Sequence, residues 1–149
     1  MVPEWIRDAP NRFDTVLVAN RGEIAVRIIK AVQEAGLRAV AIYSEPDRDS
    51  LHTEMANQSI YLPGESLSEN YLNSEAIIEA AKSSGAQAIH PGYGFLSERA
   101  EFAEAVEKSG ITWIGPSPEA IEIMGDKISA RSRMIESGVP VIPGDEVAI

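Results

Sequence analysis

Cysteine is absent from this chain of 149 residues, and there are only two histidines, His52 and His90. Without cysteine the chain can form neither a disulfide nor a thiolate metal site, which is consistent with a reducing compartment. Two histidines also argue against a histidine-rich metal site. We therefore expect no metal site among these residues.

Basic residues are scarce, since 13 Lys and Arg stand against 23 Asp and Glu, for a net charge of −10 at pH 7. Nucleic acids and anionic membranes bind through surplus Lys and Arg, so a general binder of either is not expected. No apolar run approaches the roughly 20 residues that span a bilayer, and the start MVPEWIRDAPNRFD is too polar for a secretory signal. We expect a cytoplasmic protein, in which a local basic site for a small anion is still allowed.

Short apolar runs alternate with stretches of helical periodicity. The β-branched run TVLVA suits a strand buried on both faces, and apolar residues then recur at helical spacing until Gly36. Strands are predicted at 15–19, 38–44, 59–62, 87–90 and 112–114, with helices from 24, at 51–56, from 73 or 74 to 81, from 97 or 98 to 108, and after a cap at 117. This alternation predicts an α/β fold with an open, mainly parallel, Rossmann-like sheet and helices on both faces.

The composition changes near the end of the sequence. The stretch GDKISARSRMIESGVP predicts one further helix, from Lys127 to about Ser137, and the chain then ends as if cut from a larger protein. The first residues are typical of a loosely held extension. The predicted division is an extension at 1–13, a Rossmann-like domain at 14–124 and the start of a further region at 125–149.

The turn after the first predicted strand, ANRGEIAVRI, lies where a doubly wound protein holds a phosphate. A dinucleotide site needs three spaced glycines there, but only Gly22 is present, and the carboxylate of Glu23 would repel a phosphate. Glu45, after the second strand, could imitate the acid that binds a ribose, but without the glycines we interpret it as an ordinary loop acid. The sequence therefore argues against an NAD site.

Arg27, Lys30 and Glu34 lie three and four residues apart on one polar side of the first predicted helix. Charges at this spacing usually form a solvated face with an i,i+4 ion pair, and the spacing alone favours that interpretation. A subunit contact is the alternative, because arginine is enriched at interfaces.

The segment HPGYGFLSE begins at the end of a predicted strand, since its proline removes a ladder donor. Gly92 and Gly94 leave room beside Tyr93, which offers a flat ring and a hydroxyl group, at the sheet edge where open α/β proteins bind ligands. The segment could hold a ligand. It could equally be a rigid turn with Tyr93 and Phe95 in the core and His90 satisfied by the backbone, and the residues leave both alternatives open.

Lys127 lies in the first turn of the last predicted helix if Asp126 caps that helix. A cation there is unfavourable by about 0.3–1 kcal/mol, because the helix dipole is positive at this end. A bound phosphate would make the position favourable for the lysine, since the free N–H groups and the lysine would face one anion. Lys127 is therefore a candidate phosphate ligand, with a lysine that points into water as the alternative.

Four segments, ANRGEIAVRI, AIHPGYGFLSE, WIGPS and MGDK, together resemble the N-terminal part of biotin carboxylase, from about Thr15 to Gly144. This component occurs in acetyl-CoA, propionyl-CoA and pyruvate carboxylases, and it begins with a Rossmann-like pre-ATP-grasp domain. The resemblance implies that ATP phosphorylates bicarbonate to carboxyphosphate, whose CO₂ is transferred to N1 of biotin. It implies ATP, magnesium and carrier-bound biotin as cofactors, and a biotin carboxyl carrier protein or domain and a carboxyltransferase as partners.

The resemblance also assigns residues. Lys127 matches the family's ATP-contacting lysine, and Tyr93 and Gly94 match the loop beside the biotin pocket. Three further residues match the helix face that helps to build the family's homodimer: Arg27, Lys30 and Glu34. The lysine of this set stands where an arginine is common.

In the family, a long ATP-grasp region carries the glycine-rich lid, the magnesium acids, the bicarbonate site and the catalytic arginine. The resemblance places only the start of that region in this chain, so we expect no catalytic residue here and no turnover by the chain alone. Two other hypotheses stay open. The chain could be a non-catalytic α/β module that binds a carboxylase subunit and regulates its dimerisation, or a nucleotide-binding Rossmann domain.

Overall fold

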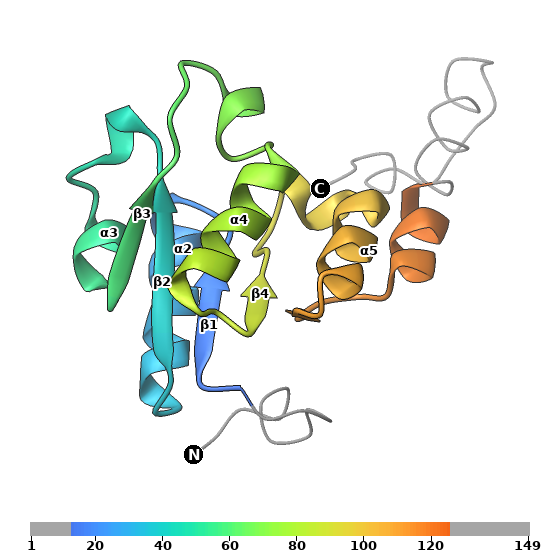
Figure 1. Ribbon diagram of the computed structural model, residues 1–149, viewed down its shortest axis with the longest axis horizontal. Helices are drawn as coiled ribbons and strands as arrows, with labels where there is room; N and C mark the ends of the chain where they lie inside the picture. Colours follow the sequence, from blue (N-terminus) through green and yellow to red (C-terminus); the bar gives the residue numbers. More distant parts are fainter. Residues whose placement is uncertain (1–12, 126–149) are drawn as a thin grey trace, which may run out of the picture.

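The structure, a computed structural model, describes residues 13–125 and shows a five-stranded sheet covered by helices (Figure 1). The strand order is β3-β2-β1-β4-β5, and all neighbouring strands run parallel. The elements are β1 (Thr15–Val18), α2 (Gly22–Glu34), β2 (Arg38–Tyr43), η1 (Glu45–Asp47), α3 (Leu51–Met55), β3 (Gln58–Tyr61), η2 (Leu67–Glu69), α4 (Ser74–Ser84), β4 (Ala88–His90), η3 (Phe95–Glu98), α5 (Ala100–Lys108) and β5 (Thr112–Trp113). Residues 118–125 are also helical. The predicted open, parallel, Rossmann-like sheet is confirmed.

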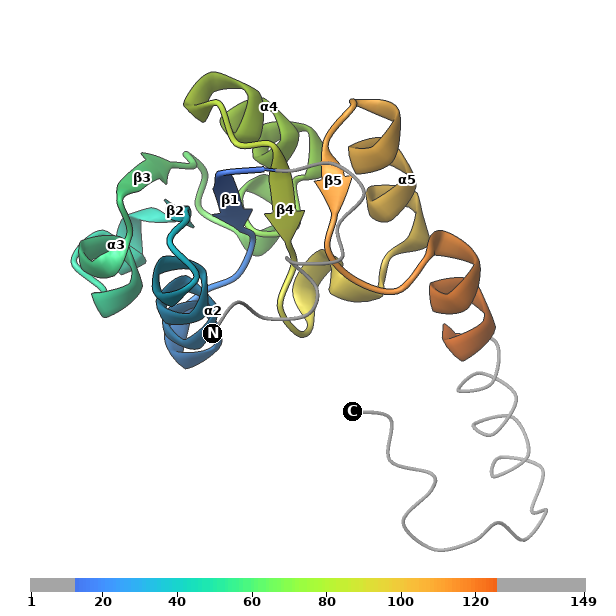
Figure 2. The same ribbon diagram turned by 90° about the horizontal axis from the view of Figure 1, so that it is seen from below.

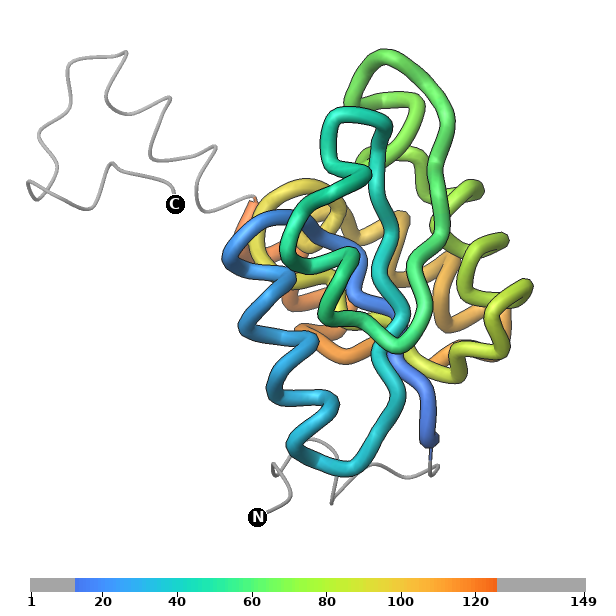
Figure 3. The backbone as a smooth tube through the Cα atoms, turned by 90° about the vertical axis from the view of Figure 1, so that its left-hand side faces the viewer, coloured from blue at the N-terminus to red at the C-terminus, as the bar shows by residue number. Residues whose placement is uncertain are grey.

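Successive residues of β1 point to opposite faces of the sheet, and both faces are covered. Val16 and Val18 are fully buried in the cluster that includes α2, whereas Leu17 is fully buried in the cluster that includes α4 and α5. Figure 2 shows α2 and α3 on one side of the strands and α4 and α5 on the other, and Figure 3 shows α2 and α4 on opposite sides. The apolar run of β1 is thus buried on both faces, as its composition predicted.

Local sequence sets the ends of several helices. Asn73 Oδ1 accepts a hydrogen bond from the Ala76 N–H at 3.0 Å and caps α4, which ends at Gly85 in the left-handed conformation. Ser117 Oγ accepts from the Ala120 N–H at 3.2 Å, so the predicted cap is confirmed for the helical residues 118–125.

The helix predicted to begin at Ser97 or Glu98 begins later. The backbone of Arg99 is extended, with φ −105° and ψ 106°, and separates η3 from α5, which starts at Ala100. Leu96 within η3 is buried, with 5% of its surface exposed. The anchoring of Leu96 in the core turns the chain before α5 can start, which spacing along the sequence does not reveal.

The boundary regions of the predicted division, 1–13 and 125–149, lie almost entirely outside the described residues. Within residues 13–125, no helix is both long and apolar enough to cross a membrane. The same residues contain no group of three or more His, Asp or Glu side chains that could hold a metal ion. The central pair β1 and β4 brings together the two segments that follow these strands, Ala19–Arg21 and Pro91–Gly94.

Candidate functional site

Asn20 joins the two segments that follow β1 and β4. The end of β1 is fixed against β4 by the Ala19 N–H, which donates to the carbonyl oxygen of His90 at 2.9 Å. The side chain of Asn20 is fully buried, and its Nδ2 donates to the carbonyl oxygens of Pro91 at 2.9 Å and Tyr93 at 2.7 Å. Its Oδ1 accepts from the Arg21 N–H at 2.8 Å. All the hydrogen atoms of this carboxamide are therefore used to hold the loop after β4.

His90 holds the same loop from the end of β4. Its Nδ1 accepts a hydrogen bond from the Gly92 N–H at 3.1 Å. Burial lowers the pKa of His90 to about 4, so the imidazole is neutral at pH 7. Because Nδ1 accepts, the proton of the neutral ring is on Nε2.

The loop places Tyr93 in solvent rather than in the core. The side chain of Tyr93 is 75% exposed, and the glycines on either side of it have φ of +68° and +70°. Phe95 differs, because its ring packs against Tyr71 with centroids 5.5 Å apart. The rigid-turn alternative is therefore wrong for Tyr93 but right for Phe95. It is also right for His90, whose Nδ1 bonds the backbone.

A groove of about 240 Å³ lies between α2 and this loop. Its lining residues are Ile24, Arg27, Ile28, Ala31, His90 and Tyr93. Three of the four α2 residues are apolar, the fourth carries a guanidinium group, and Tyr93 contributes an aromatic ring. The groove therefore brings together Tyr93 and Arg27, two residues that the sequence analysis had assigned to different roles.

The polar face of α2 is exposed but carries no internal ion pair. Arg27, Lys30 and Glu34 are all solvent-exposed. Among residues 13–125, ion pairs join Arg21 to Asp47 and Arg48 to Glu45, and none involves this face. The i,i+4 pair that the spacing favoured is thus not formed, while the prediction of a solvated face is confirmed for the chain by itself.

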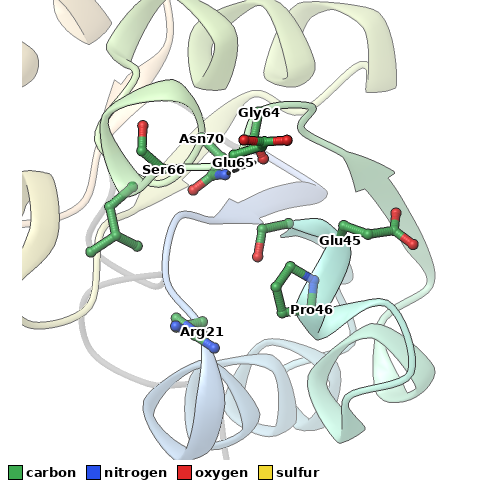
Figure 4. Close-up of a pocket in the computed structure, with 9 residues that line it drawn as sticks. Arg21, Glu45, Pro46, Gly64, Glu65, Ser66 and Asn70 are labelled. Atoms are coloured by element: carbon green, nitrogen blue, oxygen red, sulfur yellow. Dashed lines mark hydrogen bonds between the residues drawn. The ribbon is translucent and has the colours of Figure 1, made fainter.

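A second hollow, of about 350 Å³, lies beyond the carboxyl ends of β1 and β2 and is drawn in Figure 4. Its lining includes Arg21, Glu45 and Asn70. Arg21 already pairs with Asp47, and Glu45 already pairs with Arg48, which also lowers the pKa of Glu45 through their hydrogen bond. Arg21 and Glu45 are therefore already paired within the chain, and we take the groove beside Tyr93 as the better candidate site.

The network behind the second hollow centres on the buried carboxylate of Asp47. Asp47 is 6% exposed and accepts hydrogen bonds from the guanidinium group of Arg21 and the hydroxyl group of Tyr71. The Tyr71 oxygen in turn accepts from the Ser44 N–H at 3.2 Å. Burial, together with the hydrogen bond to Asp47, raises the pKa of Tyr71 to about 12. Tyr71 therefore stays protonated and continues to donate.

Replacement of Tyr71 by phenylalanine is expected to lower the free energy of unfolding by about 2 kcal/mol, because a buried carboxylate loses a donor. The Ser44 N–H loses its acceptor at the same time. Urea denaturation followed by circular dichroism measures the change. Tyr61→Phe is the control, since that ring is 40% exposed, and it should stay within about 0.5 kcal/mol of the original chain. Similar losses for both variants would contradict the role given to the Tyr71 hydroxyl group.

Lys127, the residue assigned to ATP, lies outside the residues that the structure describes. Gly94, assigned with Tyr93 to the biotin pocket, is exposed in the loop, and a Cβ atom there would meet nothing within 4 Å. The described part of the site thus consists of the Tyr93 loop, the α2 side of the groove and the residues that hold them.

Comparison with known families gives a decisive match. The family described as "Biotin carboxylase, N-terminal domain" matches residues 12–121 of this chain. The chain belongs to this family. The predicted resemblance is therefore confirmed, and the parallel sheet with the Tyr93 loop is the sheet of a biotin carboxylase N-terminal domain.

Known biotin carboxylases are similar along most of this chain. The biotin carboxylase of Halalkalibacterium halodurans is 56% identical over 137 residues, which are 92% of this chain and 30% of that protein. The biotin-dependent acyl-coenzyme A carboxylase alpha3 subunit of Mycobacterium leprae is 50% identical over 136 residues, which are 91% of this chain and 23% of that protein. The chain thus spans 30% or less of the length of these two curated relatives.

Solved structures show the same domain. The crystal structure of the Kluyveromyces lactis urea carboxylase matches with a TM-score of 0.77 and 50% identity, over 88% of this chain and 12% of that one. The crystal structure of a Campylobacter jejuni biotin carboxylase–beta-gamma-ATP complex matches with a TM-score of 0.76 and 47% identity, over 92% of this chain and 31% of that one.

Sequence reasoning missed three residues that organise this biotin carboxylase domain. Asn20 was passed over because its turn was searched for glycines, although a polar residue directly after a buried strand is itself a signal. Asp47 lay in a segment interpreted as a loop, and Tyr71 preceded a helix cap without any pattern of its own. Positions 47 and 71 meet only through the fold.

Proposed function

We propose that this N-terminal domain works in an ATP-dependent ligase that uses bicarbonate to carboxylate biotin on a carrier protein. The observation that carries the proposal is the exposed ring of Tyr93, which a hydrogen-bonded loop holds beside a groove at the carboxyl edge of the sheet. The names of the relatives, biotin carboxylases and a biotin-dependent carboxylase subunit, support it. A carboxyltransferase partner would then pass the carboxyl group to the final acceptor.

The apolar lining of the groove suits the ring system of biotin. Ile24 and Ile28 offer apolar contact. Tyr93 would form a flat wall, and Gly94 would let the ring approach the backbone because it has no side chain. When bound, biotin supplies the nitrogen that receives the carboxyl group.

ATP is assigned to Lys127 on the MGDK segment and on membership of the family. If the predicted helix from Lys127 forms, this lysine would lie in its first turn, where it and the free N–H groups would suit a phosphate. Magnesium is assigned to the ATP-grasp region on membership of the family.

The exposed face of α2 supports a second part of the proposal, a subunit contact in a homodimer. Arg27, Lys30 and Glu34 are exposed, and among the residues that the structure describes none of them forms an ion pair. A charged face of this kind can pair with a partner's charges and set the orientation of the two subunits.

The test is a chimera in which this chain replaces the matching segment of the Halalkalibacterium halodurans biotin carboxylase. We expect bicarbonate-dependent ATP hydrolysis that free biotin stimulates, measured as phosphate release. Lys127→Ala should lower the rate about 100-fold, which is typical for the loss of one group that stabilises transferring charge. Tyr93→Ala should raise the KM for biotin instead and leave hydrolysis without biotin unchanged.

Lys82→Ala is the matched control, because Lys82 is an exposed lysine on α4, away from the groove. It should leave all rates within twofold of the original chimera. An active chimera that biotin does not stimulate would contradict the biotin proposal, and a rate unaffected by Lys127→Ala would contradict the ATP assignment.

A further inference from the structure

We propose that Asn20 is a positioning residue for the biotin site, which fixes Tyr93 and Gly94 without contacting the ligand. This inference rests on the proposed function, because it assigns a role to a residue behind the same site. Asn20 has no exposed surface, so it cannot itself touch a molecule in the groove. Whatever it contributes to binding must therefore pass through the loop.

The hydrogen bonds of Asn20 select the two carbonyl groups that flank Gly92. Nδ2 donates to Pro91 on one side and to Tyr93 on the other, at 2.9 and 2.7 Å, and both bonds are directed from the end of β1. Oδ1 is held by the Arg21 N–H, so the carboxamide cannot turn over without losing all three bonds. Of the side chains of this size, only a carboxamide donates twice and accepts at the same time.

Gly92 shows how closely the loop lies on this carboxamide. A Cβ atom at Gly92 would be 2.7 Å from Asn20 Nδ2 and 3.1 Å from Asn20 Cβ. Asn20 therefore packs closely against the loop backbone as well as donating hydrogen bonds to it. The Gly92 N–H is held by His90, and the Gly94 carbonyl oxygen accepts from the Ser97 N–H at 2.9 Å. The backbone around Tyr93 is thus fixed before a ligand arrives.

A loop that is already ordered binds more tightly, because the ligand does not bear the entropy cost of ordering it. The ring of Tyr93 is 75% exposed, so little side-chain packing holds this residue, and its backbone hydrogen bonds fix the position from which the ring extends. Loss of the Asn20 donors should therefore weaken biotin binding. Steps that need only ATP and bicarbonate should be unaffected.

The test uses Asn20→Asp in the chimera described above. Aspartate has the same shape and keeps the acceptor for the Arg21 N–H, but it replaces both donor bonds with repulsion between oxygen atoms. We expect the KM for free biotin to rise at least tenfold, while bicarbonate-dependent ATP hydrolysis without biotin stays within twofold. Asn20→Ser, which is smaller and uncharged, gives a second measurement and should raise the KM in the same direction.

Gln33→Glu is the matched control, because Gln33 on α2 also uses its carboxamide as a donor, to the carbonyl oxygen of Met55 at 2.6 Å. It removes a similar bond elsewhere and should leave the KM for biotin within twofold. An unchanged KM in a folded Asn20 variant, or an equal loss of hydrolysis with and without biotin, would overturn the inference. If the unmodified chimera turns over ATP but does not respond to biotin, the proposed function fails instead.

Discussion

Replacement of Gly92 by alanine is expected to lower the free energy of unfolding by about 2–5 kcal/mol. Its φ of +68° costs an L-residue roughly 1–2 kcal/mol. The new Cβ would also lie 2.7 Å from Asn20 Nδ2 and 3.0 Å from Ile24 Cγ2, and overpacking of this kind costs about 1–3 kcal/mol. The overpacking cost adds to the strain, because the Asn20 carboxamide cannot move away from the new Cβ without losing its hydrogen bonds.

Gly85→Ala separates the two costs. Gly85 also has a positive φ, +76°, but a Cβ atom there would meet nothing within 4 Å. This variant should lose only about 1–2 kcal/mol from backbone strain. Urea denaturation followed by circular dichroism gives both values under the same conditions. Equal losses at the two positions would show that the contact between Gly92 and Asn20 adds nothing.

Lowering the pH from 7 to 4 is expected to remove up to about 3 kcal/mol of stability through His90 alone. The folded pKa is about 4, below the ordinary value of 6.5, because burial disfavours the charged ring. Between these values the unfolded chain binds more protons than the folded one, so stability rises with pH there. The full contribution of His90 to stability is present above about pH 6.5. It is lost as the pH falls towards 4, and each unit of pKa shift corresponds to about 1.4 kcal/mol.

His90→Asn isolates this contribution from that of the carboxylates, which also begin to titrate near pH 4. An asparagine can accept a hydrogen bond from the backbone N–H two residues later, as His90 does from Gly92, but it does not titrate. Urea denaturation of both chains at several pH values should show a flatter profile for His90→Asn between pH 6.5 and 4. Parallel profiles would mean that His90 does not carry this pH dependence.

The strands, the helices and their order follow from short-range patterns. The β-branched run of β1, the Asn73 cap and the glycine that ends α4 each act over a few residues, so the sequence predicts them without knowledge of the fold. The exceptions have a tertiary cause. The start of α5 is displaced to Ala100 because Leu96 of η3, which precedes α5 in the chain, is buried in the core.

The candidate site divides in the same way. The residues of the loop left a ligand site and a rigid turn both open, and the family resemblance assigned Tyr93 and Gly94 to the biotin pocket. The groove beside them also contains Arg27, which spacing had placed on a solvated face. Spacing could not reveal that Arg27 and Tyr93 line one groove, because these two residues are 66 positions apart in the sequence. Pairing of β1 with β4 alone brings them together.

The sequence by itself determined the class of fold and the family, since both depend on short motifs of residues that are neighbours along the chain. Only the tertiary structure decided that Asn20 holds this loop, that Asp47 and Tyr71 share a buried network, and that His90 is kept neutral. These properties arise from burial and from hydrogen bonds between distant segments. Such contacts exist only once the strands have paired and water has been excluded.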